Sequence, residues 1–172
     1  MKRAIFILFF LSFSCVPTEY KYFVRTYNEL QNINWERNIL NYLPLSDDIV
    51  YESTVIRRTV SLLQTQSFSK LKVYLSQQQE KDSDFYFAQT LYLMAKADYS
   101  NAWLSLEAVD KNKYEPIQSL ISIDLTYELN KKRGFNDYVR ILDSYQTLLD
   151  NYPNDNALRN IIALRTRYIR YN

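Results

Sequence analysis

Ser67 and Lys70 have the spacing of a serine nucleophile and the lysine that helps to activate it. A base close to a serine hydroxyl makes its oxygen reactive, so this pair would give the chain acyl-transfer chemistry. No K-T-G sequence follows, although serine-lysine enzymes of this kind carry one, and the chain is small for their fold. Ser67 also stands directly before an apolar helical run. We therefore predict that Ser67 caps a helix.

Asp47 and Asp48 are adjacent carboxylates that could perform acid-base chemistry or hold a cation. They follow Ser46 and precede a helical run, and acidic side chains in a first helical turn interact favourably with the helix dipole. We therefore predict a structural role for them. Carboxylates distant in the sequence can still meet in a fold, which leaves a carboxylate-based enzyme as the least favoured hypothesis.

Two features of the composition exclude common catalytic devices. The sequence has no histidine, which removes Ser-His-Asp and Cys-His nucleophiles and imidazole metal ligands. Its single glycine cannot form a glycine-rich phosphate loop or a dinucleotide fingerprint. We therefore predict a protein that is not an enzyme and that uses no cofactor and no metal.

Cys15 is the only cysteine and follows a hydrophobic run. Lys2 and Arg3, the apolar segment 4–13 and the small Ser14 have the layout of a secretory signal. The apolar segment is shorter than the about 20 residues that a membrane-spanning helix needs. A disulfide within one chain is excluded, because there is no second cysteine.

The sequence Leu-Ser-Phe-Ser-Cys resembles a relaxed form of the lipobox of bacterial lipoproteins. In that family the cysteine thiol carries diacylglycerol, the signal is cut just before it, and the new amino end is acylated as well, for example with palmitate. The resemblance implies a signal peptide over 1–14 and a lipidated cysteine with a short tether over 15–18. Val16 is not the aspartate that favours inner-membrane retention in some bacteria, so an outer-membrane address in the cell envelope is implied. The alternatives are a non-lipidated signal with a stray thiol and an uncleaved anchor.

The charge of the mature chain is balanced. Once Lys2 and Arg3 are removed with the signal, nineteen basic and nineteen acidic side chains remain. Nucleic-acid binding depends on a basic surface, and neither a net positive charge nor a long basic run is present. We therefore predict no nucleic-acid partner.

Composition and spacing predict an all-α domain over 19–172. Four prolines and one glycine are too few for the many tight turns of a β fold, and 16% aromatic residues argue against disorder. Apolar residues recur at helical spacing throughout. The predicted helices span 19–32, 35–43, 47–65, 68–79, 84–97, 100–109, 116–133, 138–152 and 156–170.

End signals mark two of these helices. Pro116 opens one of them, and Gly134 follows its basic last turn, where a left-handed residue is favoured. Asn136 can cap the next helix and Pro153 closes it. The two helices therefore form an antiparallel hairpin.

The predicted helices pair, and an aromatic residue opens the second helix of each pair: Trp35, Phe68, Tyr99 and Phe135. These aromatics are 33, 31 and 36 residues apart. A two-helix repeat of about 34 residues is the tetratricopeptide period. The spacing therefore favours stacked antiparallel helical hairpins.

The stretch AKADYSNAWLSLEAV resembles the tetratricopeptide core motif, with Ala97 in place of the turn glycine. The aromatic and packing positions are Tyr99, Ala102, Leu106 and Val109. The resemblance implies a tetratricopeptide-like α-solenoid. A second stretch, YQTLLDNYPNDNALRNIIALR, is similar to repeat-joining segments of envelope lipoproteins, among them the tetratricopeptide lipoproteins of the outer-membrane β-barrel assembly machinery. It implies an envelope scaffold with a protein partner.

A candidate binding surface lies beside the main apolar stripes, on the first helices of two successive hairpins. Its members are Tyr86, Gln89, Leu93, Ile123 and Tyr127. First helices line the concave face of stacked repeats, and tyrosine suits protein interfaces. Contact between neighbouring repeats is the alternative role.

We therefore expect a lipid-anchored envelope adaptor that binds another protein and reaches the membrane through lipid on Cys15. The alternative is a carrier whose groove holds a small molecule or a cell-wall fragment.

Overall fold

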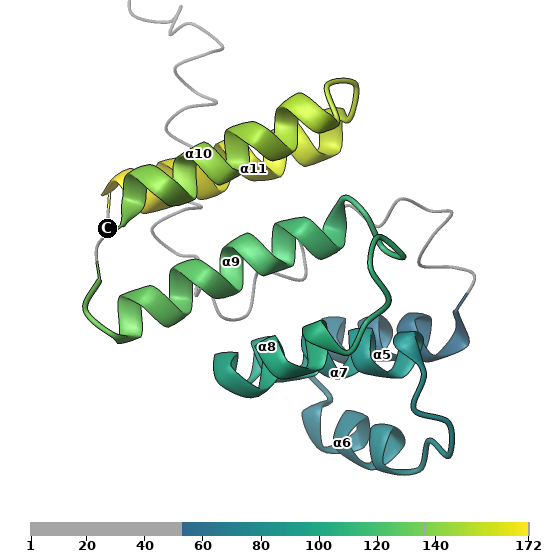
Figure 1. The fold of residues 1–172 in the computed structure, drawn as a ribbon. Coiled ribbons are helices and arrows are strands. Elements are labelled where there is room, and N and C mark those ends of the chain that lie inside the picture. Colours follow the sequence, from purple (N-terminus) through teal and green to yellow (C-terminus); the bar gives the residue numbers. More distant parts are fainter. Residues whose placement is uncertain (1–52, 136, 172) are drawn as a thin grey trace, which may run out of the picture. The chain divides into compact units, whose positions relative to one another are not determined.

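The computed structural model describes residues 53–135 and 137–171, and the regular structure in these ranges is entirely helical (Figure 1). The described residues all belong to one compact unit of the chain. Their helices are α5 (Thr54–Gln64), α6 (Phe68–Ser76), α7 (Ser83–Ala95), α8 (Tyr99–Glu107), α9 (Ile117–Lys132), α10 (Tyr138–Asn151) and α11 (Asn156–Tyr171). The predicted all-α class is confirmed.

From α6 onward, the observed helices match the predicted ones to within a few residues. The helix predicted over 47–65 differs, because α5 begins only at Thr54. Ser53 is its N-cap, and the Ser53 hydroxyl accepts a hydrogen bond from the Ile56 amide at 3.3 Å. Asp47 and Asp48, which the sequence places in the first turn of the predicted helix, lie outside the described residues. The helices predicted over 19–32 and 35–43 lie outside the described residues.

Carboxylate caps start three of the later helices. Asp82 Oδ1 accepts from the Phe85 amide at 2.9 Å, and Asp98 Oδ1 accepts from the Asn101 amide at 3.4 Å. At the start of α11, Asp155 Oδ1 accepts from the Leu158 amide at 2.8 Å. Each bond satisfies an amide that the helix itself leaves unpaired. Asp137 is the N-cap of α10, and the predicted cap Asn136 lies outside the described residues.

The first helix of each observed hairpin ends in the same turn. A left-handed residue follows the helix, with φ of 53° at Gln66, 56° at Ala97 and 75° at Gly134. The amide of that residue bonds to the carbonyl three residues back, and the next amide bonds to the carbonyl five residues back. The six bonds are Gln66 to Leu63 (2.9 Å), Ser67 to Leu62 (2.8 Å), Ala97 to Met94 (2.9 Å), Asp98 to Leu93 (2.9 Å), Gly134 to Lys131 (3.1 Å) and Phe135 to Asn130 (3.0 Å). This pair of bonds defines a Schellman motif, so three hairpins share one turn.

The described helices pack mainly against their neighbours in sequence. Helix α7 packs against α5, α6 and α8, while α9 packs against α8 and α10, and α11 packs against α10. In a regular stack of hairpins, each first helix would also pack against the next first helix. Helices α5 and α7 do so, whereas the backbones of α7 and α9 show no comparable approach within the described ranges. Solenoid stacking along the whole domain therefore remains a prediction.

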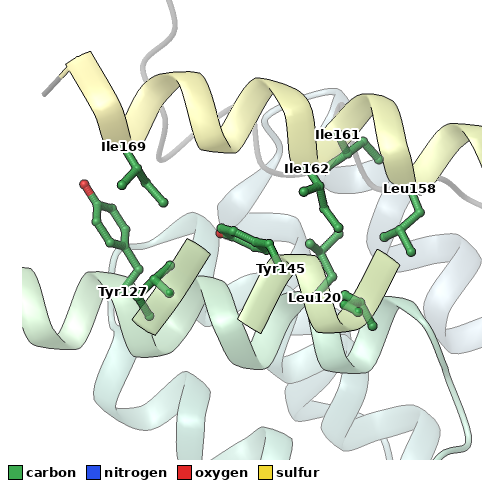
Figure 2. Close-up of a cluster of buried hydrophobic side chains, with 9 residues drawn as sticks. Leu120, Tyr127, Tyr145, Leu158, Ile161, Ile162 and Ile169 are labelled. Atoms are coloured by element: carbon green, nitrogen blue, oxygen red, sulfur yellow. The ribbon is translucent and has the colours of Figure 1, made fainter. Parts of the chain in front are cut away.

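A buried apolar cluster joins α9, α10 and α11 (Figure 2). Its members are Leu120, Tyr127, Ile141, Tyr145, Leu148, Leu158, Ile161, Ile162 and Ile169. Figure 2 shows the rings of Tyr127 and Tyr145 lying between the isoleucines of α11 and helix α9. Tyr145 of this cluster also belongs to a buried polar network with Asp124 and Arg165.

Candidate functional site

A buried polar network joins α9, α10 and α11 through Asp124, Tyr145 and Arg165. Arg165 Nε donates to both carboxylate oxygens of Asp124, at 2.6 and 2.7 Å, and Arg165 Nη2 forms an ion pair with Asp124 Oδ2. The Tyr145 hydroxyl donates to Asp124 Oδ1 at 2.6 Å. Each of the three residues is 1% exposed. One carboxylate therefore receives donors from two other helices.

The protonation states in this network follow from burial and charge. Burial acts to lower the pKa of Arg165, but the Asp124 carboxylate outweighs it and the net shift is upward. Burial and the same carboxylate raise the pKa of Tyr145 well above its usual value. Arg165 is therefore charged and Tyr145 is a neutral donor. Because substrate cannot reach residues buried so completely, we assign the network to stability and to the alignment of the helices.

Sequence reasoning missed this network, although a signal was present. Asp124 lies on the apolar stripe of α9 with Leu120 and Ile121, and Arg165 lies on the stripe of α11 with Ile161 and Ile162. An acid at one core position and a base at another core position indicate a buried ion pair, since an unpaired buried charge is very costly.

A second polar cluster fastens the loop before α9 to the start of α7. Asp84 Oδ1 accepts from Lys113 Nζ at 2.7 Å and from the Tyr114 hydroxyl. The Tyr114 ring stacks on Phe87, with ring centroids 4.3 Å apart. Burial acts to raise the pKa of Asp84, but hydrogen bonds from Lys113, Tyr114 and Ser53 outweigh it and hold the pKa below its usual value. Burial and the Asp84 carboxylate raise the pKa of Tyr114.

Ser67 and Lys70, which have the spacing of a serine-lysine pair, do not form one. Ser67 is the N-cap residue of α6, but its hydroxyl makes no capping bond. Instead it accepts from Thr65 Oγ1 at 3.1 Å and donates to the Thr65 carbonyl at 3.4 Å. Within the described part of the chain, no hydrogen bond joins Ser67 to Lys70. The prediction that Ser67 stands at the cap position is correct, whereas the expected bond from its side chain is absent.

The predicted binding surface falls into two groups. Tyr86, Gln89 and Leu93 lie at helical spacing on α7 and are each partly exposed. Ile123 and Tyr127 lie on α9, whose backbone does not pack closely against α7 within the described ranges. The structure therefore keeps the α7 group together on one helix face, and it does not join that group to the α9 group.

Tyr127 is a core residue. It is 3% exposed, and its ring lies 6.4 Å from the Tyr138 ring and 6.5 Å from the Tyr168 ring. Ile123 packs against the same cluster. Burial raises the pKa of Tyr127 above its usual value. Contrary to the prediction, Tyr127 offers no surface to a partner in this structure, and contact between neighbouring helices is its role.

A hollow with a volume of about 470 Å³ lies between α5 and α6. Its lining is Arg58, Leu62, Ser69, Lys70, Val73, Tyr74 and Gln77. The lining therefore combines apolar and basic side chains from two helices.

A smaller hollow of about 220 Å³ lies between α8 and α9. Its lining is Trp103, Leu106, Glu107, Lys111, Asn112, Glu115, Gln118, Ser119 and Ser122. Ser119 donates to Glu115 Oε1 at 2.8 Å, while the buried Glu115 Oε2 has no hydrogen-bond partner within the described ranges. Trp103 Nε1 donates to Glu107 Oε1 at 2.9 Å. This lining is polar and carries both signs of charge.

Cys15, and with it the expected signal and tether over 1–18, lies outside the described residues. In 53–135 and 137–171, no three Asp, Glu, Cys or His side chains converge as metal ligands. None of the helices in those ranges is long and apolar enough to cross a membrane.

No protein-family model, curated protein or solved structure matches this chain.

Proposed function

We propose that the protein is a lipid-anchored adaptor of a bacterial cell envelope, which binds another protein through its helical hairpins. The observation that carries the proposal is the recurrence of one Schellman turn at Gln66, Ala97 and Gly134. Three hairpins closed in the same way support a repeat architecture. Such architectures present extended binding surfaces, and many act by binding proteins.

The anchor gives the adaptor a physical mechanism. Lipid on Cys15 confines the body to a membrane surface, where its effective concentration near membrane partners is much higher than in solution. Two acyl chains suffice for stable anchoring, because each buried CH₂ contributes about 0.8 kcal/mol. The sequence around Cys15 supports this part of the proposal.

The partly exposed face of α7 is the candidate partner surface that remains from the five predicted residues. Tyr86, Gln89 and Leu93 combine an amphipathic aromatic, a hydrogen-bonding amide and an apolar side chain. Truncating an aromatic residue at the centre of an interface commonly costs more binding energy than truncating its neighbours. Tyr86 is therefore the first side chain to test.

Cross-linking in the native envelope tests the proposal. The protein would be cross-linked, extracted with mild detergent and purified, and its copurifying proteins identified. We expect a specific partner that is lost from Tyr86→Ala with Leu93→Ala and kept by Val139→Ala, which truncates an apolar side chain that is 71% exposed on α10. The absence of any stoichiometric partner would reject the adaptor function.

The lipid anchor has an independent test. We expect the intact mass of the purified protein to show acyl groups on Cys15, and we expect Cys15→Ala to abolish both processing and membrane retention. A mass without acyl groups would reject the anchor, as would a Cys15→Ala chain that is still processed and membrane-bound.

The hollow between α8 and α9 favours a second candidate, a carrier of a small polar molecule. Glu115 Oε2 is buried there without a partner, and Trp103 and Glu107 lie in the same lining. A ligand with an amine could satisfy the carboxylate and lie against the indole ring. Small-molecule extraction of the purified protein tests this candidate, and a Glu115→Gln variant should lose the extracted compound.

A further inference from the structure

The α5–α6 hairpin is basic. Residues 53–79 contain Arg57, Arg58, Lys70 and Lys72 and no acidic side chain. The remaining described residues carry twelve basic and thirteen acidic side chains. The net positive charge of the described residues therefore lies on this hairpin, which attracts an acidic partner.

The hollow between α5 and α6 places two of these cations beside apolar surface. Arg58 and Lys70 are exposed and line the hollow, and no residue among those described forms an ion pair with either. Leu62 is 8% exposed and Val73 is 54% exposed in the same lining. An apolar centre with a charged rim is the arrangement found in protein interfaces.

The spacing of the lining residues fits a helix. Arg58 and Leu62 are four residues apart on α5, and Ser69 and Val73 on α6 and its C-cap Gln77 follow one another at the same spacing. Rows of side chains at this spacing form the ridges between which a third helix packs. A hollow between two helices is also better filled by a side-chain ridge than by the flat surface of a membrane.

We propose that the α5–α6 groove, lined by Arg58, Leu62, Lys70, Val73 and Tyr74, binds an acidic amphipathic helix of a partner protein. The apolar face of that helix fills the hollow against Leu62 and Val73. Its acidic flanks pair with Arg58 and Lys70, which fixes its orientation and excludes basic helices. The inference rests on the proposed adaptor function and names the chemistry of the partner.

The test measures the binding of a labelled helical peptide to the mature full-length protein in mild detergent. The peptide carries leucines along one face and glutamates on both flanks, and a control peptide carries lysines in place of the glutamates. Arg58→Glu with Lys70→Glu reverses the two charges of the groove. Arg57→Glu with Lys72→Glu is the matched control, because it makes the same charge change on the same two helices outside the lining.

We expect the acidic peptide to bind the unmodified and control proteins equally, and the groove variant about tenfold more weakly or worse. Val73→Gln should also weaken binding, and the lysine peptide should not bind. All of these side chains are exposed, so the helical circular dichroism of the variants should match that of the unmodified protein.

Four outcomes would overturn the inference. The first is that the unmodified protein does not bind the acidic peptide. Equal weakening by the two charge-reversal pairs would indicate unspecific attraction. Displacement of the peptide by phosphatidylglycerol nanodiscs, but not by phosphatidylcholine ones, would assign the groove to an anionic membrane. Peptide binding that appears only in Asp47→Asn with Asp48→Asn would assign it to the chain's own acidic segment.

The same variants separate this inference from the adaptor function. If cross-linking identifies a partner that Arg58→Glu with Lys70→Glu retains, the groove assignment fails and the adaptor function stands. If the peptide binds as expected but no partner is found in the envelope, the groove assignment stands and the adaptor function fails.

Discussion

Removing the charge of Asp124 should destabilise the domain more than most single changes would. Asp124→Asn removes the carboxylate charge that pairs with the Arg165 guanidinium, which is buried at 1% exposure. Breaking a buried ion pair in this way costs about 3–5 kcal/mol. Domains are typically stable by only about 5–15 kcal/mol. For a chain of this size the expected fall in Tm is roughly 6–20 °C.

Other replacements in the network should follow a definite pattern. Tyr145→Phe removes one hydrogen bond to a charged acceptor, for an expected cost of about 1.5–3 kcal/mol. Replacing all three groups together, as Asp124→Leu, Tyr145→Phe and Arg165→Met, removes the carboxylate along with the guanidinium and the hydroxyl that donate to it. Apolar replacements of whole buried ion pairs are often neutral or stabilising. We therefore expect the triple variant to be more stable than Asp124→Asn alone.

Urea denaturation followed by far-ultraviolet circular dichroism measures these free energies of unfolding. The slope of the unfolding free energy against urea concentration should be the same for all variants, since each exposes the same surface on unfolding. The coupling energy between Asp124 and Arg165 follows from the double-mutant cycle. A cost below about 1 kcal/mol for Asp124→Asn, or a triple variant whose cost equals the sum of the single costs, would refute the buried network.

Three further predictions concern the turns and the ionisable groups. Ala97→Gly should stabilise the protein in urea by about 1 kcal/mol, because φ is 56° there, and Gly134→Ala, whose new Cβ would meet nothing within 4 Å, should destabilise it by a similar amount. Burial raises the pKa values of Tyr114 and Tyr127 above 10.0. The contribution of these hydroxyls to stability is therefore full below pH 10.0 and is lost above it. In an alkaline titration, tyrosinate absorbance and loss of helical signal should rise together. Burial acts to raise the pKa of Asp84, but hydrogen bonds lower it below 3.8. The contribution of the Asp84 carboxylate to stability is therefore present above that pH and is lost in acid. Tyr114→Phe should reduce this acid dependence of stability.

The helices could be predicted because their apolar residues recur at a period that only a helix turns into one buried face. The left-handed turn at Gly134 could be predicted for a similar reason, since glycine adopts that conformation at little cost. The start of α5 could not. Apolar residues continue upstream of Ser53, and periodicity does not reveal that the Ser53 hydroxyl caps the helix there.

The burial of Tyr127 could not be predicted from one apolar stripe. Helix α9 packs against α8 and also against α10, so it buries more than one face. Its buried residues include Ile121 and Leu125 as well as Tyr127 and Glu128. A residue beside the main stripe of such a helix lies in a second interface rather than on a surface. Tertiary neighbours decide which case applies, and the sequence of one helix does not contain them.

Side-chain size explains why packing differs along the described chain. Ala88 of α7 and Ala102 of α8 are fully buried, and such small side chains let helix backbones approach closely. Tyr138 lies three residues after Phe135, as Ala102 lies three residues after Tyr99, and Tyr138 packs against the α9–α11 cluster that contains Tyr127. Asp124 likewise meets α11 through the long side chain of Arg165. Small buried side chains therefore let α7 and α8 pack directly, whereas long side chains make the contacts among α9, α10 and α11.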